Sequence, residues 1–104
     1  MIIFNETVIV EEAFHEQWLE WMQQFYIPEV MATGYFNSSQ VLNVIDSPNE
    51  GVTYCIQYST DNIENFNQFY SKHLHQLQAK HNQQFADQFV LFNTLMRTVD
   101  PKWD

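Results

Sequence analysis

The sequence of 104 residues contains little glycine, little cysteine and little positive charge. Its two glycines cannot form a glycine-rich loop that binds phosphate. Its one cysteine, Cys55, excludes an intrachain disulfide and cysteine-based metal motifs, and its place in a strand-like run predicts a buried structural thiol. Since no signal-peptide pattern or membrane-span-length apolar run is visible, we expect a cytoplasmic protein.

The charge is strongly one-sided, with four Lys and Arg residues against 13 Asp and Glu residues and a net charge of −9. An anionic surface repels phosphate groups, so we expect neither a nucleic-acid partner nor binding to anionic membranes. Hydrophobic residues make up 45% of the chain and aromatic residues 16%, which is enough for one core in a single domain over residues 1–104. The aromatic content fits a dense core, a subunit interface or an apolar pocket.

The hydrophobic periodicity alternates between strand and helix patterns along the chain. It predicts strands over residues 2–10, 35–46, 52–59 and 88–99, and helices over residues 11–26 and 63–85. Pro28 lacks a backbone N–H, so we expect the first helix to break at Ile27 and a short helical piece to follow over residues 28–33, with Gly34 just past its end. Thr60 or Asp61 is expected to cap the second helix.

This order of elements, βαββαβ, predicts an α+β fold of the ferredoxin-like kind, in which a four-stranded antiparallel sheet carries two helices on one face. The last strand is apolar on both faces. One row contains Val90, Phe92 and Met96, and the other contains Phe89, Leu91 and Leu95. The two helices can cover only one row. We therefore expect a homodimer that joins the open sheet faces into a dimeric α/β barrel.

Several segments together resemble a bacterial family of domains of unknown function. The most specific is the stretch from Ile27 to Gly34, and the others are 5–8, 18–22, 51–54 with Gln57 and Tyr58, His81 with Phe85, and 92–95. The resemblance covers nearly the whole chain and implies a ferredoxin-like fold of the dimeric α/β-barrel type. It implies no activity, because the family itself has none assigned. The wider barrel group includes cofactor-free monooxygenases, haem-degrading enzymes, isomerases and stress-related proteins.

The candidate catalytic residues are Glu6, His15, His73 and His81. Glu6 interrupts an apolar strand face that we assign to the helices, and a buried carboxylate needs a partner or a proton. The three histidines fall on apolar helix arcs, where each one alone is more often a structural residue at the boundary of the core. A histidine paired with Glu6 in an apolar cavity would form a general base.

Candidate ligand-binding residues are Trp18, Met22, Tyr26, Tyr54 and Phe66, which would line a pocket between helices and sheet. Arg97, placed with Asn93 on the face away from the helices, would bind a substrate carboxylate or an acid of the partner subunit. We expect no metal, because His73 and His81 lie roughly 12 Å apart along a helix. We also expect no cofactor.

Two functions remain open from the sequence. The first is binding or transformation of a small apolar or aromatic molecule in a pocket between helices and sheet, by proton abstraction or oxygenation. The second is a non-catalytic dimeric module, structural or regulatory, in which the aromatic residues form core and interface. A cavity that touches at least two of the four candidate catalytic residues would favour the first function, and the sequence leaves open whether the protein is an enzyme.

Overall fold

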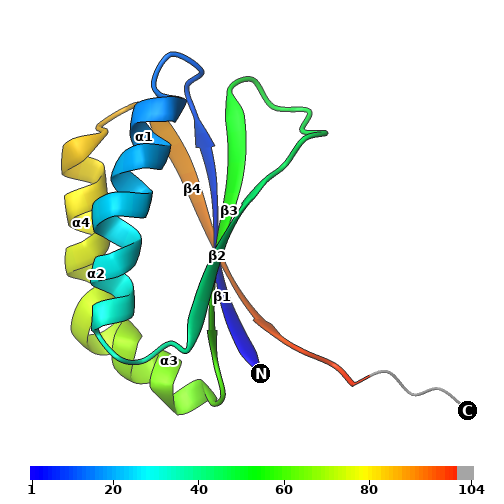
Figure 1. The fold of residues 1–104 in the computed structure, drawn as a ribbon, viewed down its shortest axis with the longest axis vertical. Helices are drawn as coiled ribbons and strands as arrows, with labels where there is room; N and C mark the ends of the chain where they lie inside the picture. Colours follow the sequence, from blue (N-terminus) through cyan, green and yellow to red (C-terminus); the bar gives the residue numbers. More distant parts are fainter. Residues whose placement is uncertain (101–104) are drawn as a thin grey trace, which may run out of the picture.

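The computed structural model describes residues 1–100 as one sheet with helices packed on one of its faces (Figure 1). Two helical segments each contain a π-helical turn between two α-helices. The elements are β1 (Ile2–Val10), α1 (His15–Trp21), a π turn (Met22–Tyr26), α2 (Ile27–Ala32), β2 (Ser38–Asn43), β3 (Val52–Thr60), α3 (Ile63–Phe69), a π turn (Tyr70–Leu74), α4 (His75–Gln84) and β4 (Phe89–Arg97).

The sheet has the strand order β2-β3-β1-β4, and every neighbouring pair is antiparallel. Both helical segments lie on the same side of it, and no element of the described chain covers the other side (Figure 1). This arrangement confirms the predicted α+β, ferredoxin-like fold. Within it, β2 and β3 form an antiparallel hairpin.

The core lies between the helices and one face of the sheet. β1 contributes Phe4, Val8 and Val10 to it, and β3 contributes Tyr54, Ile56 and Tyr58. The period of two in both strands predicted this face correctly. On β4, Phe89 and Leu91 pack against the core, so the other row, Val90, Phe92 and Met96, faces away from the helices.

The expected helix break at Ile27 is wrong, since α1, the π turn and α2 form one continuous segment. The Ile27 N–H donates to the Met22 carbonyl, five residues back, and Pro28 occupies the first turn of α2. The wider π turn separates the proline ring from the preceding turn and shifts the hydrogen-bond register, so the missing N–H of Pro28 leaves the helix intact.

Several element boundaries also differ from the prediction. The second helix is capped by Asn62, whose side chain accepts from the Asn65 N–H at 2.9 Å, rather than by Thr60 or Asp61. α1 begins at His15 instead of residue 11. β2 is shorter than residues 35–46, because Phe36 turns into the core before pairing begins.

Both glycines lie at turns where a positive φ is needed, and Gly34 is where it was predicted. Gly34 follows α2 with a φ of 82°, a conformation that favours glycine. Gly51 precedes β3 with a φ of 89°, and a Cβ there would lie 2.5 Å from the Val10 carbonyl oxygen.

No helix of residues 1–100 is both long and apolar enough to cross a membrane. The cytoplasmic location stays a prediction, and the expected tail from Pro101 lies outside the described residues.

Candidate functional site

Glu6 lies in the middle of β1 with its side chain in the core, where it is 1% exposed. Burial raises the pKa of Glu6 from 4.5 to about 7, and a hydrogen bond with the Gln78 side chain partly opposes this. Its Oε2 atom has no hydrogen-bond partner among the described residues. A carboxyl with these properties exchanges its proton near neutral pH, as a general base must.

Two buried tyrosines, Tyr26 and Tyr58, interact electrostatically with this carboxyl, and their hydroxyls also lack a partner among the described residues. Tyr58 lies two residues after Ile56, the strand partner of Glu6, and therefore on the same face of the sheet. Tyr26 ends the first π turn. Burial raises the pKa of both phenols, and the charge of Glu6 raises it further. Both hydroxyls therefore stay protonated at neutral pH.

His81 is as deeply buried as Glu6, but its surroundings differ. Its Nε2 accepts a hydrogen bond of 2.8 Å from the Trp18 indole N–H. Its ring stacks on Phe89 with a centroid distance of 3.9 Å and an interplanar angle of 2°. Burial lowers the pKa of His81 to about 4, so the ring is neutral at physiological pH. These contacts make His81 a packed core residue.

The other two candidate histidines, His15 and His73, make their hydrogen bonds and ring contacts with residues other than Glu6. His15 is half-buried at the start of α1, where its Nδ1 lies 3.0 Å from the Tyr54 hydroxyl. His73 is half-buried in the second π turn and contacts the rings of Tyr35 and Phe69. His15 is linked to His81 through the stacked rings of Tyr54 and Trp18, whereas His73 packs with Phe69. Among the described residues, no hydrogen bond joins any of these three histidines to Glu6.

The remaining candidate residues are distributed over the core and the sheet edge. Trp18 and Met22 are fully buried, and the Phe66 ring packs on Phe4 at 5.2 Å. Arg97 pairs with Ile2 in the sheet register, so it lies on the helix side, and its placement on the outward face is wrong. The strand alternation puts Asn93 on the helix side too, and that prediction failed because it treated polar strand positions as outward-facing.

A pocket of about 350 Å³ opens between α4 and β4, lined by Gln78, His81, Asn82, Phe89, Leu91 and Asn93. Two of the residues that line this pocket are also neighbours of Glu6. Asn93 is the β4 partner of Glu6, and Gln78 contacts the Glu6 carboxyl. Of the four predicted catalytic residues, this pocket touches His81 alone, so it does not meet the expectation of a cavity that touches at least two of them.

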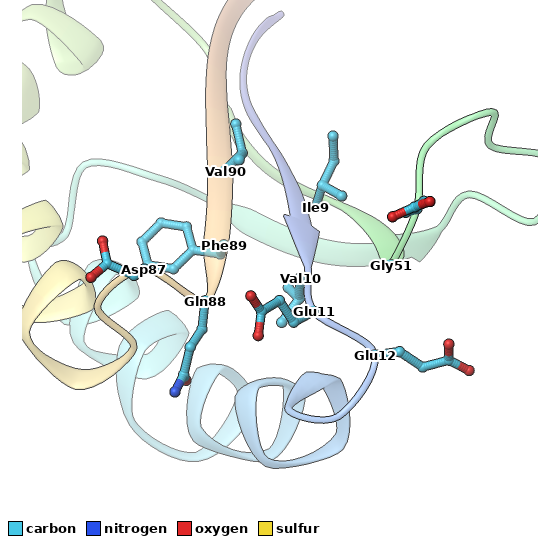
Figure 2. Close-up of a pocket in the computed structure, with 10 residues that line it drawn as sticks. Ile9, Val10, Glu11, Glu12, Gly51, Asp87, Gln88, Phe89 and Val90 are labelled. Carbon is cyan, nitrogen blue, oxygen red and sulfur yellow. The ribbon is translucent and has the colours of Figure 1, made fainter.

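A larger pocket of about 550 Å³ lies at the ends of β1, β3 and β4 (Figure 2). Four carboxylates line it, from Glu11, Glu12, Glu50 and Asp87. Figure 2 shows the Glu12 and Asp87 side chains pointing away from each other on opposite sides. Within residues 1–100, no group of three or more His, Cys, Asp or Glu side chains is placed to hold a metal ion. This pocket lacks a buried titratable group, so the α4–β4 pocket is the stronger candidate.

The sequence interpretation missed Tyr58, Gln78 and Asn93 as parts of the site. Tyr58 was assigned to the correct face of β3, and an antiparallel register with β1 would have placed it beside Glu6. Gln78 lies three residues before His81 and therefore on the same helix face. No sequence signal distinguishes Asn93, because its role follows from its position opposite Glu6 in the sheet.

Comparison with solved structures finds the same fold in proteins of very different sequence. An ethyl tert-butyl ether d (EthD) family protein from Bacillus halodurans has a TM-score of 0.64 at 14% identity, covering 95% of this chain and 100% of its own. A Deinococcus radiodurans protein, described as a candidate antibiotic biosynthesis monooxygenase, has a TM-score of 0.57 at 15% identity, with 100% and 98% covered. A de novo designed protein with a ferredoxin fold has a TM-score of 0.52 at 12% identity, with 100% and 93% covered.

At these identities the likeness shows the fold alone. No curated protein matches the chain in sequence. The family comparison is decisive, because the match extends over residues 1–99. The chain therefore belongs to the family described as a domain of unknown function (DUF4286), and its fold is ferredoxin-like.

Proposed function

We propose that the protein binds a small molecule with an aromatic or otherwise apolar ring in the α4–β4 pocket, and that Glu6 accepts a proton from it. The observation that carries this proposal is the Glu6 carboxyl, which is buried, has a pKa of about 7 and leaves Oε2 without a partner among the described residues. An unpaired buried polar atom destabilises a fold by about 1–3 kcal/mol, so it calls for an explanation.

The route from the pocket to Glu6 passes Gln78 and Asn93. Their side-chain amides form a hydrogen bond of 3.4 Å at the pocket wall. A hydrogen bond of that length is weak, so a ligand that bonds to either amide can separate them at little cost. Since Gln78 also contacts Glu6, its displacement would bring the carboxyl into contact with the ligand.

The pocket wall fits a single planar ring with a polar edge. Phe89 and Leu91 supply an apolar surface, whereas Gln78, Asn82 and Asn93 supply amide donors and acceptors. The volume of about 350 Å³ is at the small end of ligand pockets. The names of the EthD-type and monooxygenase-type neighbours are compatible with small-molecule chemistry, although fold analogy alone is weak support.

Fluorinated single-ring aromatic fragments, observed by ¹⁹F NMR, test this proposal. We expect fragments to bind the wild-type protein and to lose binding in Gln78→Trp, which fills the α4–β4 pocket. The matched control is Gln88→Trp, which places the same side chain at the strand-end pocket and leaves binding unchanged. Binding that survives Gln78→Trp and disappears in Gln88→Trp would move the site to the strand ends and refute the proposal.

We also propose that the open face of the sheet joins two copies of the chain, which is the only requirement of the non-catalytic alternative. Val90 and Phe92 are each 54% exposed on this face. None of the strand side chains on this face is charged. They are Ile3, Asn5, Thr7, Ile9, Ser38, Gln40, Leu42, Thr53, Cys55, Gln57, Ser59, Val90, Phe92, Thr94 and Met96. In a chain with a net charge of −9, a sheet face without charged side chains is the surface on which two copies approach with least repulsion.

Sedimentation equilibrium tests the dimer. We expect a dimer at micromolar concentration and a monomer for Phe92→Glu, whereas Ile45→Glu, at a 94% exposed position in the β2–β3 loop, stays dimeric. A folded wild-type monomer would contradict the proposal. If the protein is dimeric but no fragment binds, the non-catalytic module becomes the better function.

A further inference from the structure

The two tyrosine hydroxyls beside Glu6 have no role in the proposal so far. Tyr26 is 1% exposed and Tyr58 is 0% exposed, and neither hydroxyl has a hydrogen-bond partner among the described residues. Buried hydroxyls are nearly always paired, and each unpaired one destabilises a fold by about 1–3 kcal/mol. The core therefore holds three unpaired oxygens, from Glu6, Tyr26 and Tyr58, that come from three different elements.

These three oxygens form a matched set of one acceptor and two donors. An ionised carboxylate can only accept hydrogen bonds and protons, whereas a phenol that stays protonated donates. Glu6 acts electrostatically on both phenols and Tyr26 acts on Tyr58, while the sheet register puts Tyr58 diagonally across from Glu6 on the same face. Fixed donors beside a base are the arrangement that stabilises negative charge on an oxygen as a proton leaves a neighbouring carbon.

We propose that Tyr26 and Tyr58 donate hydrogen bonds to a substrate carbonyl oxygen while Glu6 removes a proton from the adjacent carbon, so the substrate is an enolisable carbonyl compound. This inference rests on the proposed function, because none of the three groups lines the α4–β4 pocket and the molecule reaches them from that pocket only when Gln78 is displaced. It names the class of substrate and the two residues that recognise it.

The step balances without an oxidant or a cofactor. A Glu6 oxygen forms a bond to the proton, and the C–H bond of the substrate breaks. Its electron pair forms a C=C bond, and the carbonyl π pair moves to the oxygen, where the two phenol hydrogens hold it as an enolate. Return of the proton from Glu6 to the same carbon gives exchange, and return to another carbon of the conjugated system gives an isomer.

The other titratable group packed in this region does not compete for the proton. His81 contacts the Tyr26 ring at a centroid distance of 5.4 Å, but its Nε2 already accepts from Trp18. Burial lowers the pKa of His81 to about 4, so it stays neutral where Glu6 titrates. The β4 neighbour of Glu6 is Asn93, which carries no charge.

The test uses 4-nitrophenol as a mimic of the enolate and nitrobenzene as its analogue without a hydroxyl. At pH 6 free 4-nitrophenol is mostly protonated, and we expect wild-type protein to bind it as the coloured phenolate, with the proton on Glu6. Tyr26→Phe and Tyr58→Phe should each weaken phenolate binding by roughly 10- to 100-fold, the effect of one hydrogen bond to a charged group. Nitrobenzene should bind all variants equally, and the exposed Tyr70→Phe should match the wild type.

Each alternative outcome overturns a specific statement. If both probes bind and neither tyrosine variant changes the absorption of bound 4-nitrophenol, the donor pair is wrong while the pocket stands. If neither probe binds, both the pocket and the donor pair are wrong. Replacement of tyrosine by phenylalanine keeps the ring in the core, and thermal unfolding confirms that each variant is folded.

Discussion

Two buried titratable groups, His81 and Glu6, are each 1% exposed in the same core, yet their surroundings differ. His81 accepts a hydrogen bond from Trp18 and lies flat on Phe89. Glu6 has an oxygen without a partner among the described residues, beside two hydroxyls in the same condition. Satisfied polar groups stabilise a core, and unsatisfied ones destabilise it. The difference supports a structural role for the His81 cluster and is the basis of our proposal that the Glu6 cluster binds a ligand.

The largest expected effect comes from breaking the His81 cluster. Trp18→Ala removes a fully buried indole and the donor to His81, so we expect the free energy of unfolding to fall by about 3–5 kcal/mol. Denaturant unfolding followed by circular dichroism measures this loss. Phe25→Ala, at a 60% exposed position on the same helical segment, should change stability by no more than about 0.5 kcal/mol. A loss of under about 1 kcal/mol for Trp18→Ala would contradict the role of this cluster in stabilising the fold.

The next largest effect is the pH dependence of stability, to which Glu6 and His81 contribute in opposite directions. Folded Glu6 keeps its proton up to about pH 7, whereas the unfolded chain releases it near 4.5, so this group lowers stability as pH rises through that window, by about 3 kcal/mol in total. His81 has a folded pKa of about 4 and an ordinary value of 6.5, so it lowers stability as pH falls through that range. Between pH 4.5 and 6.5 the two contributions oppose each other.

Urea unfolding at a series of pH values should therefore show a nearly flat contribution from this pair in the wild type. In Glu6→Gln only the His81 contribution remains, and stability should rise with pH from about 4 to 6.5. Glu64→Gln, an exposed carboxyl on α3, should follow the wild-type profile. An unchanged profile for Glu6→Gln would mean that Glu6 titrates like an ordinary exposed glutamate.

The smallest expected effect is on the free energy of unfolding when a tyrosine hydroxyl is removed, either one with a hydrogen-bond partner or one without. The Tyr54 hydroxyl lies 3.0 Å from His15 Nδ1, so Tyr54→Phe should lower the free energy of unfolding by about 1 kcal/mol. Tyr58→Phe removes an unpartnered hydroxyl and should leave stability unchanged or raise it by about 1 kcal/mol. Thermal unfolding of both variants gives the difference directly. Equal losses at the two positions would show that the Tyr58 hydroxyl is paired after all.

Much of the fold followed from local patterns. The alternation over residues 2–10 and 52–59 assigned the helix-facing residues correctly, because a half-buried strand must repeat every two residues. The burial of Glu6 followed from the same count. The π turn before Pro28 did not, because a local proline rule takes no account of a helix that shifts its hydrogen-bond register.

The site followed from the sequence only in part. Glu6, His81 and Tyr26 were identified one by one from their place on apolar faces. Their different surroundings could not be predicted, because the Trp18 donor to His81 is 63 positions away in the chain. Asn93 was assigned to the wrong face, since a polar residue in a strand with two apolar rows carries no local sign of its direction.

The sequence by itself determined the order of strands and helices, the residues that enter the core and the presence of a carboxyl among them, because hydrophobic periodicity and steric rules act over a few neighbouring residues. Only the tertiary structure decided which buried polar atoms find partners. Hydrogen bonding depends on distances of a few tenths of an ångström between distant segments, and these distances exist only once the helices are packed on the sheet.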